Sequence, residues 1–173
     1  MKPILFQHKN YQKIMSTKKY DFTGKVALVT GSSSGIGAAI AIQLAQYGAQ
    51  VAITGRNVEA LGKVAEKVKE VSAGQEPLQI VGNLLEDAFP EELITETVAK
   101  FGKIDFLVNN AGWGTPNGSL QSPNMLEEFD TLFKLNLRVV VELTQRAAPL
   151  LEKTKGSIVN ISSFAALKPV RLL

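Results

Sequence analysis

The stretch that decides the fold is Val26-Ala27-Leu28-Val29-Thr30-Gly31-Ser32-Ser33-Ser34-Gly35-Ile36-Gly37. It opens with four apolar residues, which is typical of a parallel strand covered on both faces. Gly31 then permits a tight turn, Gly35 lets the backbone approach a phosphate, and Gly37 lets a following helix lie close to the strand. The free N–H groups of that helix's first turn would face an anion. Because strand and helix signals flank the glycines, an ordinary loop is the less favoured alternative.

Strand and helix signals alternate along the rest of the chain. Apolar runs predict strands at 26–29, 51–54, 78–81, 104–108 and 157–161. Helical spacing predicts helices at 36–47, 61–71 and 89–101, and a long helix that opens at Ser122-Pro123, as N-cap and first residue, and runs toward Pro149. This pattern predicts an α/β fold with a doubly wound parallel sheet of five strands ordered 3-2-1-4-5.

The composition excludes several kinds of site. The 173 residues include no cysteine and a single histidine, His8, so disulfides, thiol chemistry and a histidine metal site have no support. The longest apolar runs are too short to span a membrane. With 45% hydrophobic residues, the chain is expected to form one globular domain at 21–173 that acts on a small molecule.

The formal charge of +3 resides in the first twenty residues, which carry Lys2, Lys9, Lys13, Lys18 and Lys19 and no acid. The other residues, 21–173, hold 19 − 5 = 14 basic and 16 acidic side chains, so no nucleic-acid partner is expected. Residues 1–20 are interpreted as a disordered extension, with Met15 as an alternative start. A cytoplasmic location is expected, and the basic extension leaves an organellar address open.

Three further motifs follow the glycine-rich turn. They are Asn109-Asn110-Ala111-Gly112, Leu135-Asn136-Leu137 and Gly156-Ser157-Ile158-Val159-Asn160-Ile161-Ser162-Ser163. In this order and spacing, the motifs resemble those of the short-chain dehydrogenase/reductase family, from Phe22 to about Leu167. The resemblance implies a Rossmann fold and an NAD(P)-dependent oxidoreductase that interconverts a carbonyl and a secondary alcohol. It also implies a homo-oligomer for a full-length form.

Ligands of open parallel sheets bind beyond the carboxyl ends of the strands. We therefore expect one nucleotide site there, built from Gly31, Ser33, Ser34, Gly35, Ile36, Gly37, Arg56, Asn83, Leu84, Asn110, Ala111 and Gly112.

The end of the second strand favours NADP over NAD. A carboxylate there would bind the adenosine ribose of NAD and repel a 2′-phosphate, but the chain has Gly55 followed by Arg56. A guanidinium offers paired hydrogen bonds to phosphate. The alternatives are that Arg56 is an ordinary surface charge, or that it stacks on adenine without selecting the phosphate. Asn83 stands where the family usually has an aspartate toward adenine, and its amide oxygen can still accept a hydrogen bond.

Two catalytic positions follow from the resemblance. Ser163 would orient the substrate oxygen, and Asn136 would hold a water in a proton relay. The alternatives are that Ser163 satisfies local backbone groups and that Asn136, expected to be buried, bridges backbone groups. Trp113 could line a substrate pocket or cover the sheet edge.

The family's proton donor, the tyrosine of a Tyr-x-x-x-Lys motif, has no counterpart here. The tyrosines are Tyr11, Tyr20 and Tyr47, and none has a lysine four residues later. We therefore expect a truncated form with a fold that is incomplete relative to the family and with doubtful activity by itself. The alternative is a noncatalytic nucleotide-binding or interaction protein derived from that family.

Overall fold

In the computed structural model, which describes residues 20–114 and 122–164, five parallel strands form one sheet. Their order is β3-β2-β1-β4-β5, which confirms the predicted order. The bounds are β1 Val26–Val29, β2 Gln50–Gly55, β3 Leu78–Val81, β4 Phe106–Asn109 and β5 Ser157–Asn160. Val29 pairs with Ile53 on one side and Val108 on the other, so the glycine-rich turn leaves the centre of the sheet.

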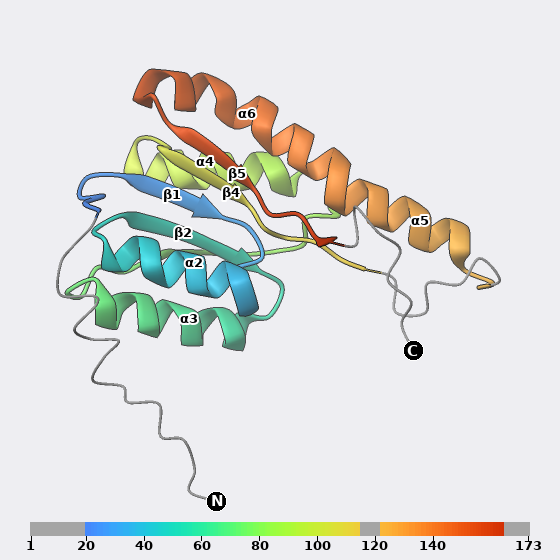
Figure 1. Ribbon diagram of the computed structural model, residues 1–173, viewed down its shortest axis with the longest axis horizontal. Coiled ribbons are helices and arrows are strands. Elements are labelled where there is room, and N and C mark those ends of the chain that lie inside the picture. The colour runs from blue at the N-terminus through green and yellow to red at the C-terminus, as the bar shows by residue number, and fades with distance from the viewer. Residues whose placement is uncertain (1–19, 115–121, 165–173) are drawn as a thin grey trace, which may run out of the picture.

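Helices cover both faces of the sheet (Figure 1). The helices α2 (Gly35–Gln46) and α3 (Val58–Val71) lie on one face. The other face carries α4 (Phe89–Phe101) and α6 (Val139–Thr154). Each layer has its own apolar core: Ala41, Val51 and Leu61 belong to the first, and Leu28, Leu107 and Leu143 to the second. This double covering explains why β1 is apolar at every position.

A continuous helical path precedes α6. It consists of α5 (Met125–Phe133) and a π-helical turn, η1 (Lys134–Arg138), and α5 extends past the sheet in Figure 1. Neither segment contains a buried residue. Leu135 is partly buried against the second core, and the first fully buried residue of this helical path is Val139.

One helix-start prediction was wrong. Ser122 is not the N-cap, because its carbonyl instead accepts a hydrogen bond from the Met125 N–H at 3.1 Å and closes a turn before α5. The cap position falls on Asn124, so Pro123 lies in that turn. The long helix, expected to run toward Pro149, continues through this exposed residue to Thr154.

The predicted extension 1–20 lies outside the described residues except for Tyr20. The Tyr20 ring stacks on Phe22 with a centroid distance of 6.1 Å and meets Tyr47 edge-on at 5.9 Å. Tyr20 thus packs with the body, and the boundary of the extension stays a prediction. Within 20–114 and 122–164, no helix has the length and apolarity needed to cross a membrane.

Candidate functional site

The turn between β1 and α2 is anchored to the end of β4. The side-chain amide nitrogen Nδ2 of Asn110 donates hydrogen bonds to the backbone carbonyls of Thr30 at 2.9 Å and Gly31 at 3.1 Å. Gly31 has a φ of 62°, and a Cβ added there would lie 2.8 Å from Cα of Ala111. A Cβ on Gly37 would collide with the Asn110 amide. The glycines therefore let the turn, α2 and the β4 end approach closely.

Thr30 makes the reciprocal contacts. Its hydroxyl oxygen accepts hydrogen bonds from the backbone N–H groups of Asn110 and Ala111, each at 3.0 Å, and its hydroxyl donates to the carbonyl of Val108 at 3.3 Å. We did not assign Thr30 a role from the sequence. The sequence does place Thr30 directly after an apolar strand, where its side chain is expected to be buried. Because a buried hydroxyl needs hydrogen-bond partners, this position could have indicated a structural role for Thr30.

The amino terminus of α2 is open. Ser34 occupies the cap position, but its side chain makes no capping hydrogen bond, and the first turn of α2 holds no acidic residue. No side chain therefore caps the N–H groups of that turn, and they point out of the helix end. The positive end of the helix dipole lies at the same place. Such an end binds anions.

A cleft of about 390 Å³ opens at the carboxyl edge of the sheet, beside this turn. Its walls include all of the residues expected to bind the cofactor except Gly37, which is buried beneath. The structure thus gathers these residues in one place, and their role in binding stays a prediction. The walls also include residues that we did not assign to the site, namely Thr54, Gly55, Gly82, Leu85 and Leu135.

Arg56 gives the cleft its charge. Among the described residues that form the walls, it carries the one ionised side chain, and no carboxylate is present. Its side chain is exposed and forms no ion pair with any residue of the described ranges. An unpaired guanidinium next to an open helix terminus makes the cleft suited to an anionic ligand.

Asn83 is partly engaged within its own loop. Its amide oxygen accepts a hydrogen bond from the backbone N–H of Leu85 at 3.1 Å. An amide oxygen has two lone pairs, so one remains for a ligand. The loop after β3 therefore offers the cleft a pre-oriented acceptor.

Asn136 lies in η1 and holds the segment that follows β4. Its amide oxygen accepts from the Trp113 N–H at 2.9 Å, and its amide nitrogen donates to the Trp113 carbonyl at 2.7 Å. The alternative that Asn136 bridges backbone groups is thereby confirmed. The expectation of burial was wrong, because Asn136 is exposed, although its neighbour Leu135 packs against the second core.

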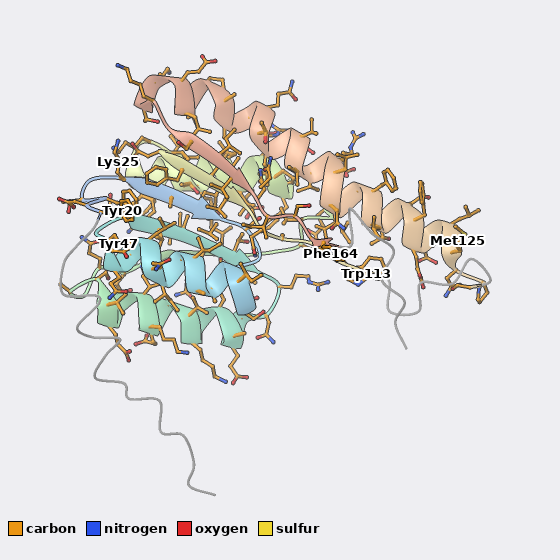
Figure 2. The ribbon with its side chains drawn as sticks, viewed as in Figure 1. Tyr20, Lys25, Tyr47, Trp113, Met125 and Phe164 are labelled. Atoms are coloured by element: carbon orange, nitrogen blue, oxygen red, sulfur yellow. The ribbon has the colours of Figure 1, made fainter. Side chains whose placement is uncertain are left out.

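Ser163 follows β5 and is exposed. It is not part of the cleft wall, and its catalytic role stays a prediction. The Ile161 N–H donates to the Asn109 carbonyl at 2.9 Å, which keeps the chain after β5 against the β4 end. Trp113 and Phe164 lie at this same end of the sheet in Figure 2.

No group of three or more His, Cys, Asp or Glu side chains in the described ranges is arranged to hold a metal ion.

The sheet order and the cleft at the carboxyl edge define a Rossmann-like α/β protein. The chain belongs to the short chain dehydrogenase family, whose family model matches residues 25–173. It is 34% identical over 166 residues to 11-beta-hydroxysteroid dehydrogenase-like 2 of Arabidopsis thaliana, covering 93% of this chain and 53% of that protein.

Two solved structures are also similar. The apo form of glucose dehydrogenase of Caenorhabditis elegans has 44% identity and a TM-score of 0.73, covering 83% of this chain and 56% of that one. A metagenomic short-chain oxidoreductase in complex with NADP has 39% identity and a TM-score of 0.76, covering 86% and 66%. The chain spans about half the length of the curated relatives it matches.

Proposed function

We propose that this chain is the cofactor-binding part of an NADP-dependent oxidoreductase that interconverts a carbonyl and a secondary alcohol. The observation that carries this proposal is the charge of the cleft, in which Arg56 stands without a carboxylate beside the open end of α2. A similar protein of the same family has been solved with NADP. The substrate class follows from family membership alone.

The residues of the cleft fit a dinucleotide. The uncapped first turn of α2 would bind the pyrophosphate, and Gly35 leaves open space there, since a Cβ added to it meets nothing within 4 Å. The Arg56 guanidinium would bind the 2′-phosphate, and the Asn83 amide oxygen would accept from adenine. The other predicted wall residues, among them Ser33, Ile36, Leu84 and Gly112, would enclose the bound molecule.

When bound, the nicotinamide supplies or accepts the hydride. The Ser163 hydroxyl would orient the substrate oxygen and stabilise charge that develops on it. Both polar atoms of the Asn136 amide are engaged with Trp113, so this side chain would act by holding the strand end beside the cleft. The second lone pair of its amide oxygen and the second N–H of its amide nitrogen remain for the water of the proposed relay.

Binding measurements test the proposal directly. We expect the protein to bind NADPH more tightly than NADH. Arg56→Asp should weaken NADPH binding by about 10- to 100-fold, because a charge-assisted hydrogen bond is replaced by repulsion, and change NADH binding by less than about threefold. Lys153→Asp makes a similar charge change at an exposed position of α6 outside the cleft wall and serves as the control. Equal losses for the two cofactors would refute NADP selection.

Turnover assays test the catalytic part of the proposal. Turnover of ketones with NADPH that is abolished by Ser163→Ala would support the oxidoreductase.

A further inference from the structure

An ion pair joins two separate parts of the cleft wall. Nζ of Lys134, the first residue of η1, lies 2.6 Å from a carboxylate oxygen of Asp87 in the loop between β3 and α4. Asp87 comes two residues after Leu85, and Lys134 comes directly before Leu135. Both leucines belong to the cleft wall. The ion pair therefore connects wall segments that lie far apart in the sequence.

The η1 side of this contact is held by the neighbours of Lys134. Leu135 packs against the second core, and Asn136 makes two hydrogen bonds with the backbone of Trp113 after β4. Three consecutive residues of the π-helical turn thus contact the loop after β3, the second core and the segment after β4. Such turns are frequent at functional sites. This turn is a fixed point to which the loop is attached.

The loop after β3 is held in part by local contacts. Leu84 packs in the second core, and the N–H groups of Leu85 and Glu86 donate back to Asn83, to its side-chain oxygen at 3.1 Å and to its carbonyl at 2.9 Å. Asp87 adds a contact with another element of the fold. The place of the loop relative to η1 therefore sets where the Asn83 oxygen lies in the cleft.

The pair is charged at neutral pH but exposed to solvent. The hydrogen bond from Lys134 and its charge, with Arg138 nearby, hold the pKa of the Asp87 carboxyl below its ordinary value. The side chains of Lys134 and Asp87 are 36% and 92% exposed, and an exposed pair contributes little to the stability of a fold. A small contribution is enough to shift a loop between arrangements of similar free energy, so we expect its effect in ligand binding.

We infer that Asp87 and Lys134 are positioning residues, whose ion pair fixes the loop after β3 against η1 and thereby holds the Asn83 acceptor in the cleft. This inference rests on the proposed function, in which Asn83 accepts from adenine. Neither charged side chain is part of the described cleft wall. The pair therefore acts through the wall residues Asn83 and Leu135.

Charge reversal tests the inference, because positioning and simple electrostatic attraction predict opposite signs. The variants are Asp87→Lys, Lys134→Glu and their combination, and calorimetry gives the dissociation constant of NADPH. Asp87→Lys adds positive charge near an anionic ligand, so attraction alone would tighten binding. Positioning predicts that both single reversals weaken binding by about three- to tenfold, since each places like charges together. The combination should return to within about twofold of the unmodified protein.

Amide exchange at Leu85 without cofactor is the second readout, because the Leu85 N–H reports whether the loop keeps its arrangement around Asn83. Both single reversals should speed this exchange by about threefold or more, and the combination should restore it. Asp87→Asn keeps the test informative if a reversal does not fold. It should also weaken NADPH binding, whereas attraction alone would tighten it.

The matched control is the ion pair of Lys69 with Glu76 at 2.5 Å, which joins α3 to the segment before β3 at the edge opposite the cleft. Lys69→Glu and Glu76→Lys should leave NADPH binding and Leu85 exchange within about twofold.

Two outcomes would overturn the inference. One is tighter NADPH binding by Asp87→Lys, and the other is a loss in the single reversals that the combined variant does not recover. If the unmodified protein does not bind NADPH, the proposed function fails, while exchange at Leu85 still decides whether the ion pair holds the loop.

Discussion

The carboxylate of Asp105 lies 2.9 Å from the ammonium group of Lys25, which precedes it by 80 residues. Its other oxygen lies 3.0 Å from Nζ of Lys103 and accepts a hydrogen bond from the Val26 N–H at 2.9 Å. Asp105 is 1% exposed and joins the beginnings of β1 and β4, at the edge opposite the cleft. Burial raises the pKa of this carboxyl, but the hydrogen bonds from Lys25, Lys103 and Val26 outweigh burial and hold the pKa below its ordinary value.

Asp105 should make stability depend on pH in acid. A carboxyl whose pKa is lowered by folding stabilises the protein above its unfolded pKa of about 4, and that stabilisation is lost as the pH falls through the folded pKa. We expect Asp105→Asn to lower the free energy of unfolding by about 1–3 kcal/mol at pH 7. The difference from the unmodified protein should shrink as the pH falls below about 4.

Urea unfolding at a series of pH values from neutral to acidic measures this difference. Glu96→Gln on α4 is the control, because Glu96 is exposed and has no ion pair within the described residues. It should change stability by less than about 0.5 kcal/mol at every pH. A difference for Asp105→Asn that is constant with pH would contradict this explanation.

The sequence predicted the parts of the fold that depend on local signals. The apolar run of β1 and the glycines after it indicate strand, turn and helix without knowledge of distant residues. The strand order followed because parallel strands joined by helices allow few topologies. The residues of the cleft wall were predictable for the same reason, since each follows the end of a strand.

Two of the wrong or missing predictions concern contacts between distant segments, and a third concerns a local turn. Asn136 sits between apolar residues and was expected to be buried, yet it is exposed while its neighbour Leu135 packs against the core. The contact of Ser33 with Gly55 depends on how closely the turn approaches β2, which sequence spacing does not give. Ser122-Pro123 fits a helix start by residue type, but a turn closed by the Met125 N–H moves the start onward.

Two buried threonines, one directly after β1 and one in β2, should respond differently to the same substitution. Thr30 and Thr54 are each 1% exposed, but Thr30 Oγ1 has three hydrogen-bond contacts, whereas Thr54 Oγ1 has no partner among the described residues. Thr30→Val should therefore lower the free energy of unfolding by about 1–3 kcal/mol. Thr54→Val should leave it unchanged or raise it by about 1 kcal/mol, because an unsatisfied hydroxyl is removed.

Chemical denaturation of the two variants gives this comparison, with each serving as the control for the other. Equal destabilisation would mean that the Thr54 hydroxyl has a partner in solution, such as a buried water.

The hydrogen bonds between Asn136 and Trp113 should be visible in fluorescence, because Trp113 is the sole tryptophan of the chain. Asn136→Asp keeps an acceptor for the Trp113 N–H but removes the donor to the Trp113 carbonyl. A carboxylate oxygen then faces that carbonyl oxygen, and neither can donate a hydrogen bond. We expect a shifted Trp113 emission and amide exchange at Trp113 that is about tenfold faster.

Asn124→Asp makes the same chemical change at an exposed residue before α5 and is the matched control. It should leave Trp113 emission and exchange unchanged. Identical spectra for Asn136→Asp and the unmodified protein would show that the two hydrogen bonds do not hold this segment.

The exposed side of α5, η1 and the first turn of α6 should mediate self-association. Five large apolar side chains between 46% and 75% exposed recur there at helical spacing, namely Leu126, Phe129, Phe133, Leu137 and Val141. The rings of Phe129 and Phe133 lie 4.3 Å apart and form one continuous surface. Contiguous apolar surface of this kind mediates association, and a closed symmetric pair would cover it with its own copy.

Sedimentation velocity at several concentrations tests this prediction. We expect the unmodified protein to associate and the double variant Phe133→Glu/Leu137→Glu to be monomeric, because charges placed in an apolar contact remain unpaired and repel their symmetric copies. Val58→Glu/Val71→Glu adds the same charge at exposed apolar positions of α3 and should leave association intact. An unmodified protein that is monomeric at every concentration would contradict the prediction, and association that survives in the Phe133 and Leu137 variant would place the contact on another surface.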